Sequence, residues 1–188
     1  CGPSGQKGLY NRQEVGLARA FAALGCRAVV LYPAADAKAP TVENPEPNIR
    51  IYYLPVRKLG AQAFFPSWQV LLEEQVDAVH VMGDNSPGVP SLYRFCRRHG
   101  IVFYSQLGAL KSTSTHAAVR AVMDLLLRRN LAIYKKTPTY AKTPAVVAEL
   151  QSLGVPCAGL MPVGLDTAII PDVPGTRAEL RCALKLDV

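Results

Sequence analysis

Apolar residues along the chain follow two alternating patterns, short dense runs and longer stretches in which they recur every three or four positions. The dense or alternating runs predict β-strands, and the stretches with helical spacing predict α-helices. Strands are expected at residues 27–32, 49–54, 78–82, 101–105, 139–143 and 157–163. Helices are expected at residues 11–24, 67–75, 90–99, 112–134, 144–153 and 176–184. Because the two kinds of element alternate, the pattern predicts an α/β fold with a Rossmann-like, mostly parallel sheet and helices on both faces.

Glycine and proline mark the ends of several of these elements. Gly25, Gly100 and Gly154 each follow a stretch with helical spacing, where a helix commonly stops. Pro90 can occupy the first turn of the helix that follows it, and Ser and Thr side chains are available to cap the longest helix. Residues 34–48 are rich in proline and small side chains, so a loop is expected there.

The predicted elements fit one lobe, residues 1–170, followed by residues 171–188 as a linker and the start of a second lobe that is absent here. A Rossmann-like lobe normally begins with a strand before its first glycine-rich loop. In this sequence the glycine-rich segment, residues 2–8, comes before any strand. The sequence leaves open whether the first strand is missing or the sheet is shorter than usual.

The composition is that of a globular domain. Of the 188 residues, 49% are hydrophobic, which is enough for one sizeable core. No run of about 20 apolar residues occurs, and the first dozen residues carry polar and charged side chains where a leader peptide would be apolar. The five cysteines are scattered, so we expect them to be reduced, with Cys26 and Cys157 in the core. These features predict a cytoplasmic protein.

The net charge of +7 is concentrated in one part of the chain. Residues 91–142 contain ten Lys or Arg and one acid, a balance of +9, whereas the remaining residues sum to −2. This segment favours an anionic partner such as a phosphate or an anionic membrane surface, although a solvated basic surface would give the same pattern. Aromatic residues do not interleave with the basic ones, so nucleic acid is disfavoured. A peripheral membrane contact would use Arg94, Arg97, Arg98, Arg128 and Arg129.

The glycine-rich segment is a candidate phosphate-binding loop. Glycines let the backbone approach a ligand closely, and the N-terminus of the following helix attracts anions. The candidate contacts to a donor phosphate are Gly5, Gln6, Lys7 and Gly8. The segment lacks the Gly-Lys-Ser/Thr ending of a P-loop. Its glycine spacing, and the lack of an acid after Tyr32, disfavour a dinucleotide-binding loop, and a simple turn remains an alternative.

Polar residues follow two of the predicted strands, at the ends where parallel sheets bind ligands. Asp84 and Asn85 can accept hydrogen bonds from an acceptor hydroxyl, or they form an ordinary Asx turn. Gln106 can bind a sugar hydroxyl, and Lys111 can bind a phosphate or lie in a solvated loop. We take Asp84 and Gln106 as candidate catalytic residues, and we count Asn11 with these four residues as acceptor-binding candidates.

The remaining candidates predict structure more than chemistry. His80 lies within a predicted strand and is expected to be a core residue with satisfied hydrogen bonds. The histidines and cysteines have no metal-ligand spacing, and no nucleophile elbow occurs, so we expect no metal site. Gly164 and Asp166 are expected to form a tight turn after the last strand, with the aspartate as a cap.

Five segments occur in an order that carries a family resemblance. They are the glycine-rich opening with helix 14–25, the Asp-x-x-His segment 76–81, the strand-helix unit 140–155, the turn 161–166 and the link 177–186. In this order and spacing they resemble the retaining glycosyltransferases of family four, which have the GT-B fold. The resemblance covers residues 2–188. In it, Gly164 and Asp166 belong to a turn similar to the family's inter-lobe Pro-x-Gly-x-Asp signature.

The resemblance implies transfer of a sugar from a nucleotide-diphosphate sugar to a hydroxyl of a sugar, lipid-linked or protein acceptor, with no further cofactor. It implies that Gly5 and Gly8 approach the donor phosphates, and that Gln106 stands where many relatives have a histidine. Most donor contacts belong to the family's second lobe, so we expect the 188 residues alone to be inactive. Two alternatives remain, an NAD-type oxidoreductase domain and a non-enzymatic module that binds anions or membranes.

Overall fold

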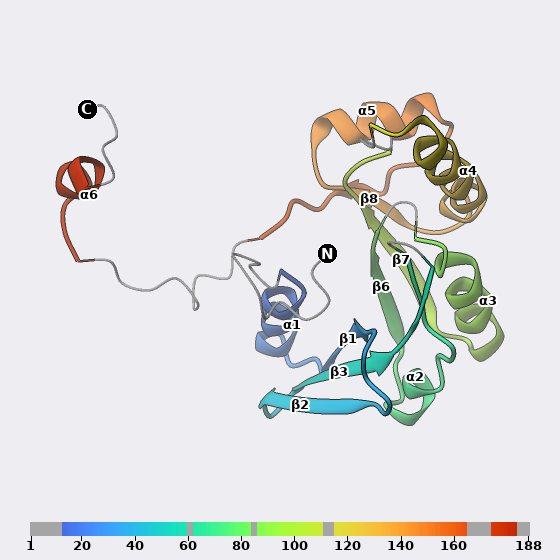
Figure 1. The fold of residues 1–188 in the computed structure, drawn as a ribbon, viewed down its shortest axis with the longest axis horizontal. Coiled ribbons are helices and arrows are strands. Elements are labelled where there is room, and N and C mark those ends of the chain that lie inside the picture. The colour runs from blue at the N-terminus through green and yellow to red at the C-terminus, as the bar shows by residue number, and fades with distance from the viewer. Residues whose placement is uncertain (1–12, 60–61, 84–85, 111–114, 165–173, 184–188) are drawn as a thin grey trace.

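The computed structural model describes residues 13–59, 62–83, 86–110, 115–164 and 174–183 (Figure 1). The helices are α1 (Gln13–Ala23), α2 (Val70–Glu73), α3 (Val89–His99), α4 (Ala117–Tyr134), α5 (Pro144–Ser152) and α6 (Arg177–Ala183). The strands are β1 (Ala28–Ala34), β2 (Thr41–Glu46), β3 (Ile49–Pro55), β4 (Arg57–Leu59), β5 (Gln62–Phe64), β6 (Ala78–Met82), β7 (Val102–Leu107), β8 (Thr139–Ala141) and β9 (Gly159–Leu160). The protein is therefore mixed α/β.

The first sheet has the strand order β1-β3-β2. β1 runs parallel to β3, and β2 runs antiparallel to β3 with a register irregularity between Glu43 and Glu46. Helix α1 packs on this sheet, because its buried residues Val15 and Ala18 share a core cluster with Ile51 of β3. Burial of these apolar side chains is what holds α1 to the sheet.

The second sheet has the order β6-β7-β8-β9, and all its pairs are parallel. Helices α3, α4 and α5 connect successive strands, as parallel pairing requires. Val79 and Val81 of β6 pack into the larger core cluster, which also contains Leu127 of α4 and Leu150 of α5. Val102 and Phe103 alternate between 57% and 5% exposed, so one face of β7 is directed into this core.

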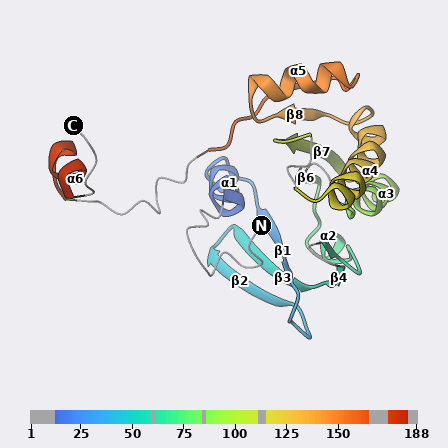
Figure 2. The ribbon, with the colours of Figure 1, turned by 45° about the horizontal axis from the view of Figure 1, so that its top comes forward.

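The first sheet approaches the second through β1. Figures 1 and 2 both show β1 on the side of its sheet that faces β6. Leu54 of β3 belongs to the larger core cluster, so the sheets pack together. Helix α1 lies on the opposite face of the second sheet from α3 and α4. Met82 and Gln106 of this sheet border α1, whereas Val81 and Leu107 belong to the larger core cluster on the side of α3 and α4. Helices therefore occur on both sides of the strands.

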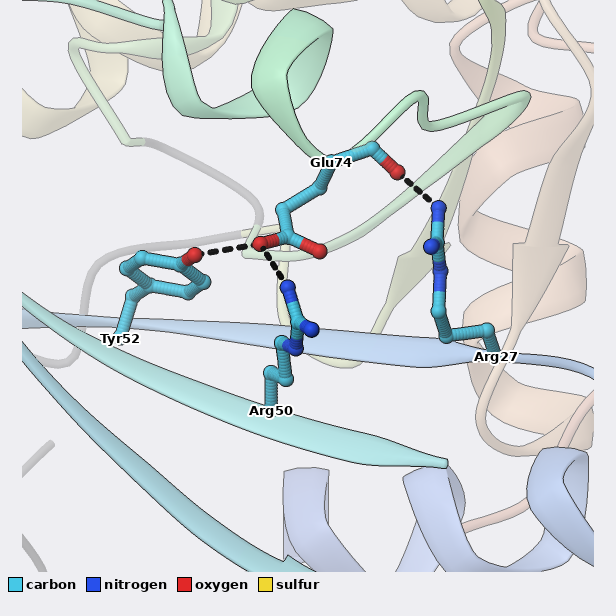
Figure 3. A network of polar contacts seen from close by, with 4 residues as sticks. All are labelled: Arg27, Arg50, Tyr52 and Glu74. Atoms are coloured by element: carbon cyan, nitrogen blue, oxygen red, sulfur yellow. Dashed lines mark hydrogen bonds and ion pairs between the residues drawn. The ribbon is translucent and has the colours of Figure 1, made fainter. Parts of the chain in front are cut away.

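A polar cluster joins the two sheets near the amino ends of their strands (Figure 3). Glu74, which follows α2, is only 4% exposed, and its Oε1 accepts hydrogen bonds from Arg50 Nη1 at 2.7 Å and from the Tyr52 hydroxyl. Arg27 donates to the backbone oxygen of Glu74. Burial acts to raise the pKa of Glu74, but the hydrogen bonds from Tyr52 and Arg50 outweigh it and hold the pKa below its ordinary value.

Several predicted elements are correct in type but differ in extent. The predicted helix 67–75 is helical only over Val70–Glu73, and the predicted last strand shrinks to Gly159–Leu160. The longest helix begins at Ala117, and its N-cap is His116 without a side-chain hydrogen bond, so the predicted Ser or Thr cap is wrong. Element ends depend on a few weak interactions, which local sequence specifies poorly.

The predicted loop at 34–48 is wrong, because it contains β2, which pairs with β3. The hairpin of β4 and β5 was not predicted either. These short strands have no apolar pattern of their own, and they form because a neighbouring strand offers a partner. β2, for example, reads Thr-Val-Glu-Asn-Pro-Glu, and its proline is tolerated because β2 is the outer strand of its sheet. Pairing partners are a tertiary property, so local periodicity does not reveal them.

The cysteine prediction is also partly wrong. Cys26 is exposed and Cys157 is half-buried, whereas Cys96 is fully buried in α3. Burial raises the pKa of the Cys96 thiol to about 11, so it remains protonated at neutral pH. The glycine predictions are confirmed: Gly25, Gly100 and Gly154 have φ values of 84°, 71° and 67°, the left-handed conformation that ends a helix. Across the described residues, we find no helix with the length and apolar character needed to traverse a bilayer.

Candidate functional site

A pocket lies where α1 meets the carboxyl ends of β6 and β7, and its volume is about 160 Å³. Most of its wall is apolar. It is lined by Gln13, Gly16, Leu17, Ala20, Met82, Gln106, Met161, Pro162, Val163 and Gly164. The last four of these residues come from the segment that follows β9, so four parts of the chain far apart in sequence meet here: α1, β6, β7 and this segment.

Gln106 is the polar residue of this pocket that comes from a sheet. It occupies β7, opposite Met82 of β6 and Tyr140 of β8, and it is only 3% exposed. Its Nε2 donates a hydrogen bond to the backbone oxygen of Met161 at 2.5 Å. Its Oε1 is buried and has no hydrogen-bond partner among the described residues. A buried acceptor without a partner costs free energy, so this oxygen is available to a donor, either the ring of His80 on the same face of the sheet or a group of a ligand.

A row of rings continues from Gln106 along the same face of the sheet. His80 lies edge-on to Tyr104 with ring centroids 4.9 Å apart, and Tyr104 lies edge-on to Tyr140 at 6.1 Å. Within the described part of the chain, neither buried ring nitrogen of His80 has a partner in good hydrogen-bond geometry, so the expectation that His80 is satisfied is wrong. Burial lowers the pKa of His80, the nearby hydrogen-bonding side chain of Gln106 acts to raise it, and the charge of Lys142 lowers it further. His80 is therefore neutral at pH 7.

The loop that contains Asp84 and Asn85 is held on both sides by α4. Tyr134 donates its hydroxyl hydrogen bond to the backbone oxygen of Gly83, and Asn130 Nδ2 donates to the backbone oxygen of Ser86, each at 2.9 Å. Asp84 and Asn85 themselves lie outside the described residues. The anchoring residues are fully buried. Sequence reasoning missed them, although two polar residues four positions apart on the buried face of a helix were a usable signal.

Lys142 is a second residue that the sequence analysis missed as a site candidate. It follows β8 and lies directly over Gly108, which follows β7. A Cβ atom at Gly108 would come within 2.8 Å of Lys142 Cδ, so a larger residue here would displace the flexible lysine side chain. The lysine therefore crosses the carboxyl ends of the strands, near the row of rings, and its charge reaches His80.

Two of the residues predicted to bind donor or acceptor, or to form the inter-lobe turn, lie at the pocket. Gly164 is exposed and borders the pocket, and Gln106 lies in its wall. The others lie outside the described residues: Gly5, Gln6, Lys7, Gly8, Asn11, Asp84, Asn85, Lys111 and Asp166. Within the described part of the chain, no group of three His, Cys, Asp or Glu side chains could hold a metal ion.

The basic segment forms an exposed surface on α3 and α4. The arginines expected to contact a membrane are all exposed: Arg94, Arg97, Arg98, Arg128 and Arg129. Three apolar side chains of α4 are also exposed, Val119, Val122 and Leu125, at 49%, 57% and 67%. Leu125 lies one helical turn before Arg128 and Arg129, so apolar and basic side chains are exposed on the same helix.

Comparison of the chain with protein families, with curated proteins and with solved structures finds no match in any of the three.

Proposed function

We propose that this chain is the N-terminal, acceptor-side lobe of a retaining glycosyltransferase with the GT-B fold, related to family four. It would hold an acceptor hydroxyl next to a nucleotide-diphosphate sugar. The observation that carries this proposal is the pocket at the carboxyl ends of β6 and β7, with the unpartnered Gln106 Oε1 in its wall.

The position of the pocket supports a ligand site. In open α/β sheets, ligands bind outside the carboxyl ends of the strands, at the point where the strand order reverses. Here α1 and α3 lie on opposite faces, and the pocket lies between α1 and β6. A Rossmann-like lobe of the GT-B type would use this crevice for its substrates.

The chemistry of the wall fits part of a sugar-binding site. Gln106 Oε1 would accept a hydrogen bond from a sugar hydroxyl, and the apolar side chains of Met82 and Met161 would contact the faces of the ring. A retaining transfer also needs positive charge to stabilise the leaving diphosphate. The lining residues include no Lys or Arg. We therefore propose that residues 1–188 alone orient the acceptor and do not transfer sugar at a measurable rate.

The first test is binding by residues 1–188. Amide spectra of ¹⁵N-labelled protein would be recorded with nucleotide-diphosphate sugars and, separately, with simple glycosides. We expect glycosides to shift the resonances of Gln106, Met82 and Gly164, with saturation in the millimolar range (~−4 kcal/mol). A nicotinamide dinucleotide serves as the control for the oxidoreductase alternative. Shifts with the dinucleotide alone would contradict the proposal, as would robust sugar transfer by residues 1–188.

We also propose a peripheral contact between this protein and an anionic membrane, made by α3 and the exposed part of α4. Basic side chains near an anionic bilayer contribute about 1 kcal/mol each, and apolar side chains add burial in the interface. Co-sedimentation with vesicles of anionic or neutral lipid would test it. We expect binding to anionic vesicles that falls with salt and with the paired change of Arg128→Glu and Arg129→Glu. Equal binding to both lipids would refute it.

A further inference from the structure

Lys142 is a half-buried cation that follows β8. Among the residues that the structure describes, its ammonium group forms no ion pair or hydrogen bond, whereas Arg19 pairs with Glu46 and Arg50 pairs with Glu74. A cation that is partly removed from water loses solvation, and a nearby anion is the usual compensation. Lys142 therefore lacks the kind of partner that these arginines have.

The side chain of Lys142 lies over the carboxyl end of β7, two residues beyond Gln106. A Cβ atom built on Gly108 would lie 2.8 Å from Lys142 Cδ and 3.5 Å from Lys142 Nζ, so the lysine crosses the space that Gly108 leaves open. Positions two residues apart on a strand share one face and are about 7 Å apart. Lys142 Nζ is therefore placed just beyond Gln106, which lines the pocket.

Tyr140 lies beside both residues on the neighbouring strand. It pairs in register with Gln106 and comes two residues before Lys142, so the three side chains share one face of the sheet. The effect of the Lys142 charge on the pKa of His80, which lies on this face, agrees with that placement. The Tyr140 hydroxyl makes no hydrogen bond with the described residues, so it is available as a donor next to Lys142.

We propose that Lys142, with the Tyr140 hydroxyl beside it, forms a phosphate-binding subsite, and that the pocket takes a sugar that carries a phosphate group. The sugar would contact Gln106, and its phosphate would contact Lys142 Nζ. The sugar in the pocket rests on the function proposed above, whereas the phosphate subsite rests on Lys142 itself. The phosphate would belong either to the nucleotide sugar or to the acceptor.

The chemistry of the subsite favours phosphate. Lysine acts as a point charge with three rotatable donors, and it binds phosphate without the bidentate geometry that arginine gives to a carboxylate. A phosphate group has several acceptor oxygens, so it can receive both the ammonium group and a neighbouring hydroxyl. The residues that line the pocket include no Lys or Arg. Lys142 would therefore supply the positive charge that the pocket itself lacks.

Gly108 offers a test that leaves the charge in place. Gly108→Ala would put a methyl group against Lys142 Cδ, so the lysine side chain would have to move. Gly108 is not in the left-handed conformation, so alanine adds no strain of that kind. Lys142→Met instead removes the charge and keeps an unbranched side chain. A local contact is sensitive to both changes, whereas the general field of the basic segment, residues 91–142, is sensitive only to the second.

Titration of ¹⁵N-labelled protein with methyl glucoside, glucose 1-phosphate and inorganic phosphate tests the subsite. We expect glucose 1-phosphate to bind about tenfold more tightly than methyl glucoside, as one hydrogen bond to a charged group would give. Lys142→Met and Gly108→Ala should each remove most of this gain and leave the Kd of methyl glucoside within about twofold of wild type. Lys136→Met is the matched control and should keep the gain, because Lys136 is exposed at the other end of β8.

The other outcomes separate the subsite from the proposed function. No gain from the phosphate group in wild type, or an equal loss of the gain in Lys136→Met, would overturn the subsite, and binding of methyl glucoside would still support the sugar pocket. Binding of inorganic phosphate that depends on Lys142, without binding of methyl glucoside, would support the subsite and contradict the sugar pocket.

Uridine diphosphate, as a fourth probe, identifies the source of the phosphate once the gain with glucose 1-phosphate depends on Lys142. Weaker binding of uridine diphosphate to Lys142→Met would assign the subsite to the nucleotide sugar. Binding of uridine diphosphate that Lys142→Met leaves unchanged would assign the subsite to a phosphorylated acceptor.

Discussion

The two ends of the strands have opposite characters. At the amino ends, Oε1 of the buried Glu74 accepts hydrogen bonds from Arg50 and Tyr52, and the backbone oxygen of Glu74 accepts one from Arg27, whereas Glu74 Oε2 has no partner among the described residues (Figure 3). At the carboxyl ends, the wall of the pocket is mainly apolar, and among the described residues neither Gln106 Oε1 nor the nitrogens of His80 have a partner in hydrogen-bond geometry. Polar groups stabilise the fold at one end and remain available at the other.

This difference separates residues expected to support the fold from residues expected to bind a ligand. A buried polar group that has its partners contributes to stability, and its removal leaves those partners unsatisfied. A buried polar group without a partner is a cost, which a fold commonly retains for binding or catalysis. Substitutions at the amino-end cluster should therefore change stability, and substitutions at Gln106 should change binding.

The largest expected effect on stability is from Glu74→Ala. It removes the acceptor of two hydrogen bonds, and we expect the free energy of unfolding to fall by about 2 kcal/mol. The value is at the lower end for buried ion pairs because the Arg50 side chain is 47% exposed and water screens its charge. Urea denaturation measures it. The exposed neighbour Glu73→Ala is the matched control, within about 0.5 kcal/mol of wild type, and equal losses for both would contradict a special role for Glu74.

At the other end, Gln106→Leu should act on function. The leucine has a similar size and removes the acceptor. For the proposed sugar transfer, we therefore expect kcat/KM to fall at least tenfold, or about 1.4 kcal/mol. Stability should change by less than about 1 kcal/mol, because one hydrogen bond to Met161 is lost together with an unpartnered buried oxygen. Ser105→Ala, on the opposite face of β7, is the control and should leave transfer unchanged. Wild-type transfer by Gln106→Leu would remove Gln106 from the site.

A smaller effect is expected where α4 holds the loop between β6 and α3. Tyr134→Phe removes the hydroxyl hydrogen bond to Gly83, and we expect a loss of about 1 kcal/mol in urea denaturation. Tyr93→Phe is the matched control, since Tyr93 has a ring contact with Phe103 and, among the described residues, no hydroxyl hydrogen bond. If both variants unfold at the same urea concentration as wild type, the loop is not held by Tyr134.

The smallest effect is the pH dependence of stability. The pKa of His80 is lowered in the folded protein, so the unfolded chain binds the proton first and stability declines as the pH falls below about 6.5. The pKa of the Glu74 carboxyl group is lowered in the folded protein. Its contribution to folding stability is therefore present above about pH 4.5 and is lost as the pH falls through the pKa that Glu74 has in the folded protein. His80→Gln should remove the pH dependence of stability only near pH 6.5 and just below it, and Glu74→Gln should remove it only below about pH 4.5. A profile unchanged by either variant would contradict these pKa directions.

Local sequence determined much of this fold. The dense apolar runs at β1, β3, β6 and β7 were predicted as strands, and the helical spacing of α1, α3, α4 and α5 was predicted as helices, because burial of one face or both leaves a periodic pattern. Gly25, Gly100 and Gly154 ended helices as predicted, since the left-handed conformation favours glycine. Gln106 was expected to follow a strand, and the structure instead places it within β7, in the wall of the pocket.

Tertiary structure alone decided the rest. β2 forms because β3 offers it a partner, His80 is left unsatisfied by what packs around it, and Glu74 becomes a buried acceptor only when β3 meets the end of α2. The division into two sheets with facing edges, and the pocket that α1 makes with residues from β6, β7 and the end of β9, also depend on segments distant in sequence. Periodicity reports which residues are buried, and it does not report what they are buried against.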